Sequence, residues 1–171
     1  GQPPENTPAS SGEVGVVLNA VVALLGGVDV AEIAEDECMA VVSRLARVRS
    51  VVDAIESQVL CRLERAQTTQ IETGHTTARW LSNETGQPHA VAKCRVHVSR
   101  KLHDHFDAVQ TALREGRISF AHAKAIVDAA NPRILDQLVE IQDQLVKIAE
   151  NAPRFELFHR ELQSIVNLLD Q

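Results

Sequence analysis

Polar side chains that can bind phosphates or base edges recur at helical spacing between residues 88 and 102. Projected at 100° per residue, one face of this stretch carries His89, Lys93, His97 and Arg100. The opposite face carries Val91, Cys94, Val98 and Leu102. Cations can meet phosphates, while other donors and acceptors can read base edges. The pattern predicts a helix with an apolar back and a front suited to nucleic acid.

This helix belongs to a stretch, residues 77–102, that has the punctuation of a helix-turn-helix. A short helix is expected over 77–83, Gly86 lies in the turn, and Pro88 opens the second helix at a position that proline favours. Further cations are expected to contact phosphates: Arg79, Lys101, Arg114, Arg117 and Lys124. The alternative is a solvent-exposed basic helix followed by a plain helical hairpin.

Two residues near this stretch are given structural roles. Arg95 falls nearer to the apolar side of the same helix, so it must reach past that side to solvent or pair with an acid. Ser119 precedes an apolar periodic stretch and is expected to cap a helix that ends near residue 130. The free N–H groups at the start of that helix could also hold a phosphate.

Histidines and cysteines in the same region raise the alternative of a metal site. Five of the seven histidines lie between residues 75 and 105, and Cys94 lies three residues before His97. The spacing fits no standard zinc module, so we predict a buried thiol and surface imidazoles, with no metal and no cofactor. The chain has no GxSxG, P-loop, GxGxxG or HExxH motif, and no catalytic residue is predicted.

Composition narrows the fold and the partners. The 171 residues are 44% hydrophobic but only 3% aromatic, which argues against a large β-sheet protein and against a stacking platform for single strands. The net charge is −6, yet residues 61–124 carry +4, between flanks of −6 (1–60) and −4 (125–171). An acidic chain is no default nucleic-acid binder, so the basic centre is the feature that suggests such a partner.

Cysteine usage and apolar runs indicate the compartment. Cys38, Cys61 and Cys94 are odd in number and widely spaced, which favours a reducing cytoplasm over a disulfide framework. Residues 14–25 are apolar, but they follow acidic rather than basic residues and are too short to cross a bilayer. We therefore predict a buried helix over about 13–25 and no membrane partner.

No segment alternates apolar and polar residues, so we predict an all-α fold with about seven or eight helices. Residues 1–12 are expected to be a flexible leader, and residues 13–171 a single helical domain. Residues 67–76 are expected to form a polar connection, and residues 103–115 a further helix.

Apolar residues recur at alternating spacings of four and three in the stretches 41–59, 134–148 and 155–169. This is the period of helices that pack lengthwise on one another. The first stretch lies in the longest expected helix, 36–66, which should pack against a partner helix along its whole length. The predicted architecture is a multi-helix bundle with two or three long packing helices and a central helix-turn-helix-like segment.

The part of the chain between residues 80 and 123 contains several short motifs: Trp80-Leu81, Thr85-Gly86, Ala112-Leu113, Gly116-Arg117-Ile118-Ser119 and His122-Ala123. Together they resemble the actinobacterial thirteen-E-twelve repeat family, number two-two-two among the domains of unknown function. The resemblance covers about residues 15–170, and the stretch from Gly116 to Ala123 is its most specific piece. Phe106-Asp107 stands where members of that family often have Leu-Pro, a departure that concerns the connection after the basic helix.

The resemblance implies a helical domain that is often followed by an HNH endonuclease module, a small metal-dependent nuclease. The chain shows no cluster of His and Asn typical of that module, so no nuclease residue is carried over to it. The role that the resemblance implies for the helical domain is to target or regulate the nuclease on DNA.

Three hypotheses follow. In the first, a non-catalytic domain binds double-stranded DNA and neutralises about five phosphates. In the second, the heptad-patterned helices form a protein–protein or homodimer interface, although such helices are more often packed within one monomer. The third, an enzyme acting alone, is disfavoured by the missing motifs.

Overall fold

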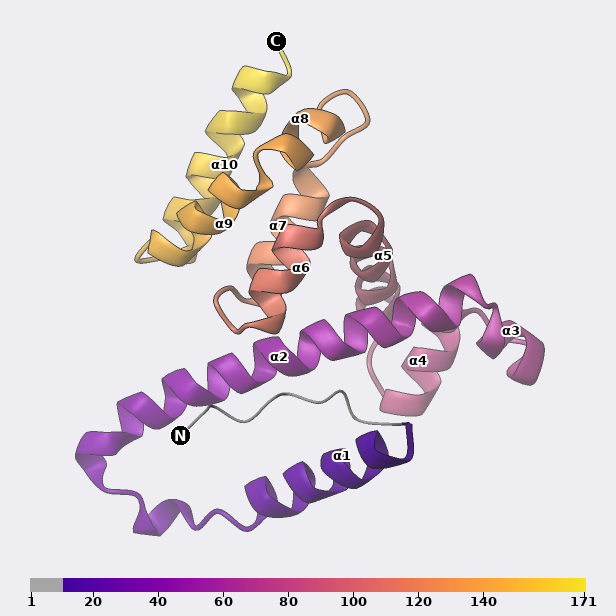
Figure 1. Ribbon diagram of the computed structural model, residues 1–171, viewed down its shortest axis with the longest axis vertical. Coiled ribbons are helices and arrows are strands. Elements are labelled where there is room, and N and C mark those ends of the chain that lie inside the picture. The colour runs from indigo at the N-terminus through magenta and orange to yellow at the C-terminus, as the bar shows by residue number, and fades with distance from the viewer. Residues whose placement is uncertain (1–10) are drawn as a thin grey trace, which may run out of the picture. The chain divides into compact units, whose positions relative to one another are not determined.

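Apolar residues at three- and four-residue spacing produce helices along the whole described chain. The computed structural model describes residues 11–171 and has ten α-helices and no strand in that range, which confirms the all-α prediction (Figure 1). The helices are α1 (Ser11–Gly26), α2 (Cys38–Arg65), α3 (Thr68–Thr73), α4 (Thr77–Thr85), α5 (His89–His105), α6 (Asp107–Arg114), α7 (Phe120–Ala129), α8 (Leu135–Glu140), α9 (Gln142–Asn151) and α10 (Phe155–Leu169).

Packing divides the described chain into two units, one ending at Val41 and one comprising Val42–Gln171. The sequence predicts a single domain from residue 13 onward. The division between the two units lies near the start of α2, after its fourth residue. The leader predicted over residues 1–12 lies outside the described residues, except that residues 11 and 12 begin α1.

The first unit contains α1, a helix that is apolar around its circumference. Val16, Val22 and Leu24 are 69%, 72% and 75% exposed. Within the first unit α1 is therefore not buried as predicted, since residues 11–41 include no second long helix that could cover it. No helix of the described chain is both long and apolar enough to cross a membrane.

In the second unit, α2 buries a face of small residues: Ser50, Ala54, Ser57 and Cys61. Polar bridges join this side of α2 to the next helices. The Arg95 guanidinium on α5 pairs with Asp53 at 2.9 Å, and the Gln110 amide on α6 donates to the Ala54 carbonyl at 3.1 Å.

The heptad-patterned face of α2 lies on the opposite side and is not covered by the other helices of the second unit. Its residues are half-buried or exposed: Leu45, Val48, Val52, Ile55 and Val59. Within the second unit, the packing that was expected along the whole length of this helix is not found. The small residues, not the heptad residues, contact the rest of the second unit.

The largest helix of the central segment, α5, lies between two apolar clusters. Its Ala92 and Val96 pack with Leu60 of α2 and Leu81 of α4. Residues on another side of α5, such as Leu102, enter the main core together with α6, α7, α9 and α10. This double burial fixes the orientation of α5 and hence of its polar side.

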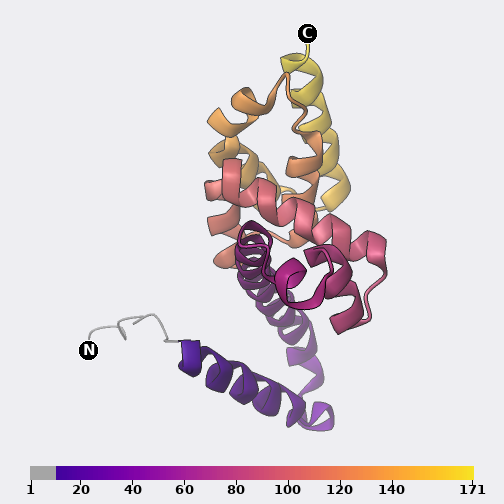
Figure 2. The ribbon, with the colours of Figure 1, turned by 90° about the vertical axis from the view of Figure 1, so that its right-hand side faces the viewer.

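The remaining helices form the main core around the other two heptad stretches. Leu138, Leu145, Phe158 and Leu162 are all buried. Figures 1 and 2 show α9 and α10 lying side by side at the C-terminal end, in contact with one another. Most of the periodic apolar residues of these two stretches are therefore buried or half-buried within one chain. This agrees with the expectation that such helices are usually packed within one monomer.

Three element boundaries differ from the prediction. The connection over 67–76 contains α3, which begins after Gln67 in a left-handed conformation (φ 52°). The stretch 134–148 divides into α8 and α9 at Ile141. The helix expected over 103–115 starts only at Asp107, because α5 continues to His105 and Phe106 turns the chain (φ −121°, ψ 60°). These interruptions raise the helix number in the described range from the expected seven or eight to ten.

Candidate nucleic-acid interface

The two helices α4 and α5 are joined by a tight turn. The Thr76 hydroxyl accepts a hydrogen bond from the Arg79 N–H at 3.2 Å and so caps the start of α4. Gly86 ends α4 with φ 73°, a left-handed conformation that favours glycine. The Ser82 hydroxyl donates to the Gln87 carbonyl at 2.7 Å, and Pro88 precedes the first residue of α5. The predicted helix, turn and helix are all present.

The apolar side of α5 is only partly the one that was predicted. Val98 and Leu102 are fully buried, as expected, but Val91 is 45% exposed. Ala92 and Val96 are buried instead, in the cluster with α4. The helical projection of the sequence assumed that α5 has one buried face. It could not predict that α5 is buried on two sides.

The four predicted front residues of α5 line one groove. Its volume is about 700 Å³, and its α5 side includes His89, Lys93, His97 and Arg100. The start of α4 lines it as well, together with two carboxylates, Glu64 of α2 and Asp128 of α7. The helical spacing therefore placed these four side chains together correctly, but it gave no sign of the two acids beside them.

Some polar groups in this groove have partners within the chain and others do not. The Arg100 guanidinium pairs with Glu64 at 3.3 Å and lies 3.4 Å from Nδ1 of His97. The Lys93 ammonium forms no hydrogen bond or ion pair with the described residues. Nδ1 of His89 is buried and has no hydrogen-bond partner among them. Lys93, His89 and one carboxylate oxygen of Glu64 are thus groove groups with unused polar capacity.

The other five predicted phosphate contacts do not line the groove. Arg79 is exposed on α4, and Lys101 is half-buried on α5. Arg114 donates to Gln58 at 2.5 Å. The remaining two, Arg117 and Lys124, form ion pairs with acids of the same chain.

Ion pairing occupies two of these cations. The hydrogen bond to Glu150 raises the pKa of Arg117, and a second bond to Glu115 adds to this effect. The hydrogen bond to Asp128 raises the pKa of Lys124. Each cation must give up these partners before it can contact a phosphate.

Arg95 has a structural role, as its position on the helix predicted. Its guanidinium pairs with Asp53 and lies over the Phe120 ring, 4.6 Å from the ring centroid. It thereby joins α2, α5 and α7 and is not available to a ligand.

The histidines and cysteines do not converge. In the described part of the chain, no three His, Cys, Asp or Glu side chains are grouped so that they could hold a metal ion. Cys61 is buried in α2, and this burial raises the pKa of its thiol. Cys94 lines the groove but is itself half-buried.

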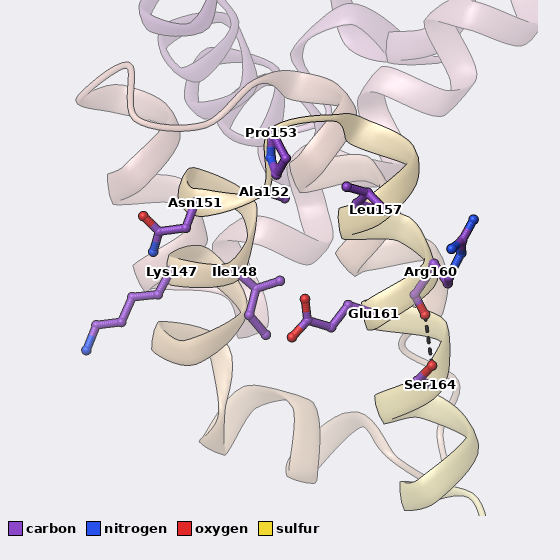
Figure 3. A pocket seen from close by; sticks show the side chains of 9 residues that line it. All are labelled: Lys147, Ile148, Asn151, Ala152, Pro153, Leu157, Arg160, Glu161 and Ser164. Carbon is purple, nitrogen blue, oxygen red and sulfur yellow. Dashed lines mark hydrogen bonds between the residues drawn. The ribbon is translucent and has the colours of Figure 1, made fainter.

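A second groove, between α9 and α10, offers a contrast. Its volume is about 600 Å³, and it is lined by Lys147 and Arg160 among others. Figure 3 shows Glu161 pointing from α10 toward Ile148 of α9, whereas Lys147 points away from the groove. This groove has two cationic side chains, as does the groove beside α5, but here the two do not point toward a common place.

A family profile described as "Domain of unknown function (DUF222)" matches residues 39–170. The chain belongs to this family. The resemblance drawn from the short motifs is thus confirmed. Comparisons with curated proteins and with solved structures found no match.

The stretch from Gly116 to Ala123, on which the resemblance depended most, has a structural role. Gly116 adopts φ 72°, and a methyl group there would overlap the Arg47 side chain. The Ser119 hydroxyl accepts from the His122 N–H, and Nδ1 of His122 accepts from the Ser119 N–H at 3.0 Å. This reciprocal pair is a capping box with histidine in the place usually held by Glu or Gln. The cap predicted at Ser119 is confirmed.

The His122 ring also packs against the core. It makes an edge contact with Phe158 at a centroid distance of 4.9 Å. Burial lowers the pKa of His122, which keeps Nδ1 free to accept a hydrogen bond at neutral pH. This stretch therefore holds α7 against α10.

One polar residue of structural importance was missed by sequence reasoning. Gln142, at the start of α9, is buried, and its Oε1 accepts from the Ala108 N–H at 3.0 Å and from the Val109 N–H at 3.4 Å. Its Nε2 donates to Asp107 at 3.2 Å. Gln142 thus satisfies the free N–H groups at the start of α6 from a different helix. No local signal could reveal a cap that comes from 34 residues away.

Proposed function

We propose that the second unit of this DUF222 protein binds the backbone of double-stranded DNA along the groove beside α5. The observation that carries the proposal is the convergence of His89, Lys93, His97 and Arg100 on one side of that groove. Four hydrogen-bonding or cationic side chains at the exposed edge of a helix-turn-helix-like segment suit phosphate contact.

The individual contacts suggest different tasks. Lys93 has no partner to lose, so its ammonium is the principal phosphate contact. Arg100 is held by Glu64 and acts second, at the cost of that ion pair. Nδ1 of His89 lacks a hydrogen-bond partner, so a ligand group that pairs with it removes a desolvation penalty.

Ion pairing also limits the strength of binding. Glu64 and Asp128 beside the groove, and the carboxylates that hold Arg117 and Lys124, reduce the number of phosphates that can be neutralised. We expect about three such contacts rather than five, which gives a slope of log K against log salt near −3. Affinity at physiological salt is then micromolar and largely independent of sequence.

In this proposal the domain is non-catalytic and works in the cytoplasm, in line with its three free thiols. The family resemblance supports a nuclease context, in which longer relatives carry a C-terminal HNH module and the helical domain targets or regulates it. The DNA contact is the part that this chain can test by itself.

The test is a fluorescence-anisotropy titration of a labelled duplex at about 50 and about 200 mM salt. The wild-type chain is compared with Lys93→Ala/Arg100→Ala and with a control of equal charge, Lys147→Ala/Arg160→Ala, from the second groove. We expect salt-sensitive binding that the first variant weakens roughly tenfold or more and the control leaves within about twofold. Absence of binding at low salt, or equal losses in both variants, would show that the groove is not the site.

A further inference from the structure

The first turns of α10 carry two exposed rings that the proposed function does not use. Phe155 is 40% exposed, and His159, one helical turn further along, is exposed as well. The two ring planes are inclined by 30° and their centroids lie 6.0 Å apart, so the rings form an offset stack. Such a pair offers a planar surface that a third ring can extend.

Contacts with the core hold the inner ring of this pair in place. The Phe155 ring lies 5.9 Å from the ring of Phe158 and 5.6 Å from that of His122, measured between centroids. Phe158 is fully buried, and His122 is fixed by its hydrogen bonds to Ser119. A row of rings therefore leads from the core to the surface and ends at His159. Because the rings are positioned in advance, a ligand that stacks on them pays little for ordering the protein.

A groove between α7 and α10 leaves room beside the two rings. Its volume is about 320 Å³, at the lower end of the range for small-ligand sites, about 300–1,000 Å³. Phe155 and His159 line its α10 side, and the Lys124–Asp128 ion pair lies on its α7 side. The rest of the α7 side consists of short side chains that leave the groove open, Ala121, Ala125 and Ala129.

Polar groups around this groove suit a nucleobase better than an apolar ring. The Asp128 carboxylate can accept hydrogen bonds from the amino groups of a base. Gln163 also lines the groove, and its Nε2 donates to Asn167 at 3.3 Å, so its Oε1 is a further acceptor. The Lys124 ammonium adds a cation that can meet the phosphate of the same nucleotide.

This groove adjoins the one beside α5. Asp128 lines both grooves, and α7 is in contact with α5 as well as with α10. A nucleic-acid strand whose phosphates meet Lys93 and Arg100 can therefore continue past Asp128 toward the two rings.

We propose that the Phe155–His159 stack binds an unpaired base of the DNA whose backbone lies along α5. The inference rests on the proposed function and adds a preference for duplexes that end in a single strand. Bases inside a duplex are covered by their neighbours, whereas unpaired bases stack readily on Phe and His rings. Since only 3% of the residues are aromatic, the pair forms one stacking place and not a platform for a long strand.

The test compares three labelled DNAs by fluorescence anisotropy at about 50 mM salt. One is a blunt duplex, the second is the same duplex with an end of about three unpaired nucleotides, and the third has abasic residues in that end. The abasic end keeps the phosphates and lacks the bases. The ratio of the affinities for the second and third DNAs therefore reports stacking separately from charge.

The variant Phe155→Leu/His159→Ala removes both rings and keeps an apolar side chain at the position that contacts the core. A matched control, His103→Ala, removes an exposed histidine of α5 that lines neither groove. Far-UV circular dichroism checks that the helices remain. If the double variant loses helix content, His159→Ala alone tests the outer ring at an exposed position.

We expect the wild type to bind the normal end roughly fivefold or more tightly than the abasic end. In Phe155→Leu/His159→Ala this ratio should fall to within about twofold of one, while His103→Ala should keep the wild-type ratio. Equal wild-type affinity for the two ends would overturn the inference. So would a ratio that the double variant preserves.

Failure of the proposed function gives a different result. In that case Lys93→Ala/Arg100→Ala leaves the affinity for the blunt duplex unchanged, whatever the ratio between the two single-stranded ends. A blunt duplex that this variant does weaken, with no gain from the unpaired bases, would overturn the stacking place alone. A wild type that binds none of the three DNAs would overturn both.

Discussion

Two regions of this protein have the same heptad period and use it in opposite ways. In α9 and α10 the periodic residues, such as Leu145 and Phe158, are buried in the main core. In α2 the periodic residues, such as Val52, are exposed, and the small residues on the other side are buried. An apolar period therefore identifies a face that can be covered, but the residues opposite to it decide whether the same chain covers it.

The largest expected effect separates the two regions directly. Leu145→Ala should lower the free energy of unfolding by about 2–5 kcal/mol, because it opens a cavity in a fully buried site. Val52→Ala should lower it by less than about 0.5 kcal/mol, because that side chain is half in water already. Urea denaturation at a low protein concentration, about 1 µM, measures both values. Similar losses in the two variants would contradict the distinction between the faces.

A second pair of variants compares polar bridges from the same two regions to α6. Gln142 of α9 is buried and caps the start of α6, whereas Gln58 of α2 is exposed and accepts from Arg114 near its end. Gln142→Ala leaves buried N–H groups unpaired and should cost about 1–3 kcal/mol. Gln58→Ala should cost less than about 0.5 kcal/mol, since water replaces the amide. Thermal unfolding of both variants beside wild type would show the difference, and equal shifts would refute it.

The C-terminal region also contains a group that should respond to pH. In the folded protein the pKa of His122 lies below its ordinary value of 6.5, so the unfolded chain binds more protons as pH falls. The stability that the neutral ring supplies is complete above about pH 6.5 and decreases as pH falls below it. His122→Ala should therefore cost about 1 kcal/mol at pH 7.5, through loss of the cap, and less at pH 5.

The conservative variant His122→Gln makes this prediction specific. A glutamine at this position can accept from the Ser119 N–H but does not titrate. Denaturation of the wild type and of His122→Gln at pH 7.5 and pH 5 should show the difference between them shifting toward the glutamine variant in acid. A difference that stays constant with pH would show that His122 does not contribute to the acid response.

Features that depend on residues close together in the sequence were predicted correctly, and features that depend on distant residues were not. Local signals were reliable: Ser119 caps α7, Gly86 ends α4, and the spacing from His89 to Arg100 placed four side chains in one groove. Each of these depends on residues within about three turns of one helix. The pairing of Arg95 was also foreseen, because an arginine on an apolar side has few alternatives.

Contacts between residues far apart in the sequence could not be predicted from local patterns. The pattern gave no sign that Glu64 and Asp128 lie beside the groove, nor that Glu150 holds Arg117. The capping role of Gln142 was missed for the same reason, since its partners are more than thirty residues away in the chain. For the candidate site, the sequence therefore indicated the cations and left out the acids that restrain them.

The smallest expected effect is that of removing one hydroxyl, Ser57, from the buried face of α2. The Ser57 hydroxyl is buried without a hydrogen-bond partner, whereas the Ser50 hydroxyl donates to the Ala46 carbonyl at 3.2 Å. If this face requires small rather than polar side chains, Ser57→Ala should raise the free energy of unfolding by about 0.5 kcal/mol, because it removes an unpaired hydroxyl. Ser50→Ala should change it by close to zero, since the gain in helix propensity is offset by the lost hydrogen bond. Ser57→Leu should instead cost about 1–3 kcal/mol by overpacking. Urea denaturation of the three variants decides whether small size holds α2 against α5 and α6, and destabilisation by Ser57→Ala would show that the hydroxyl itself is needed.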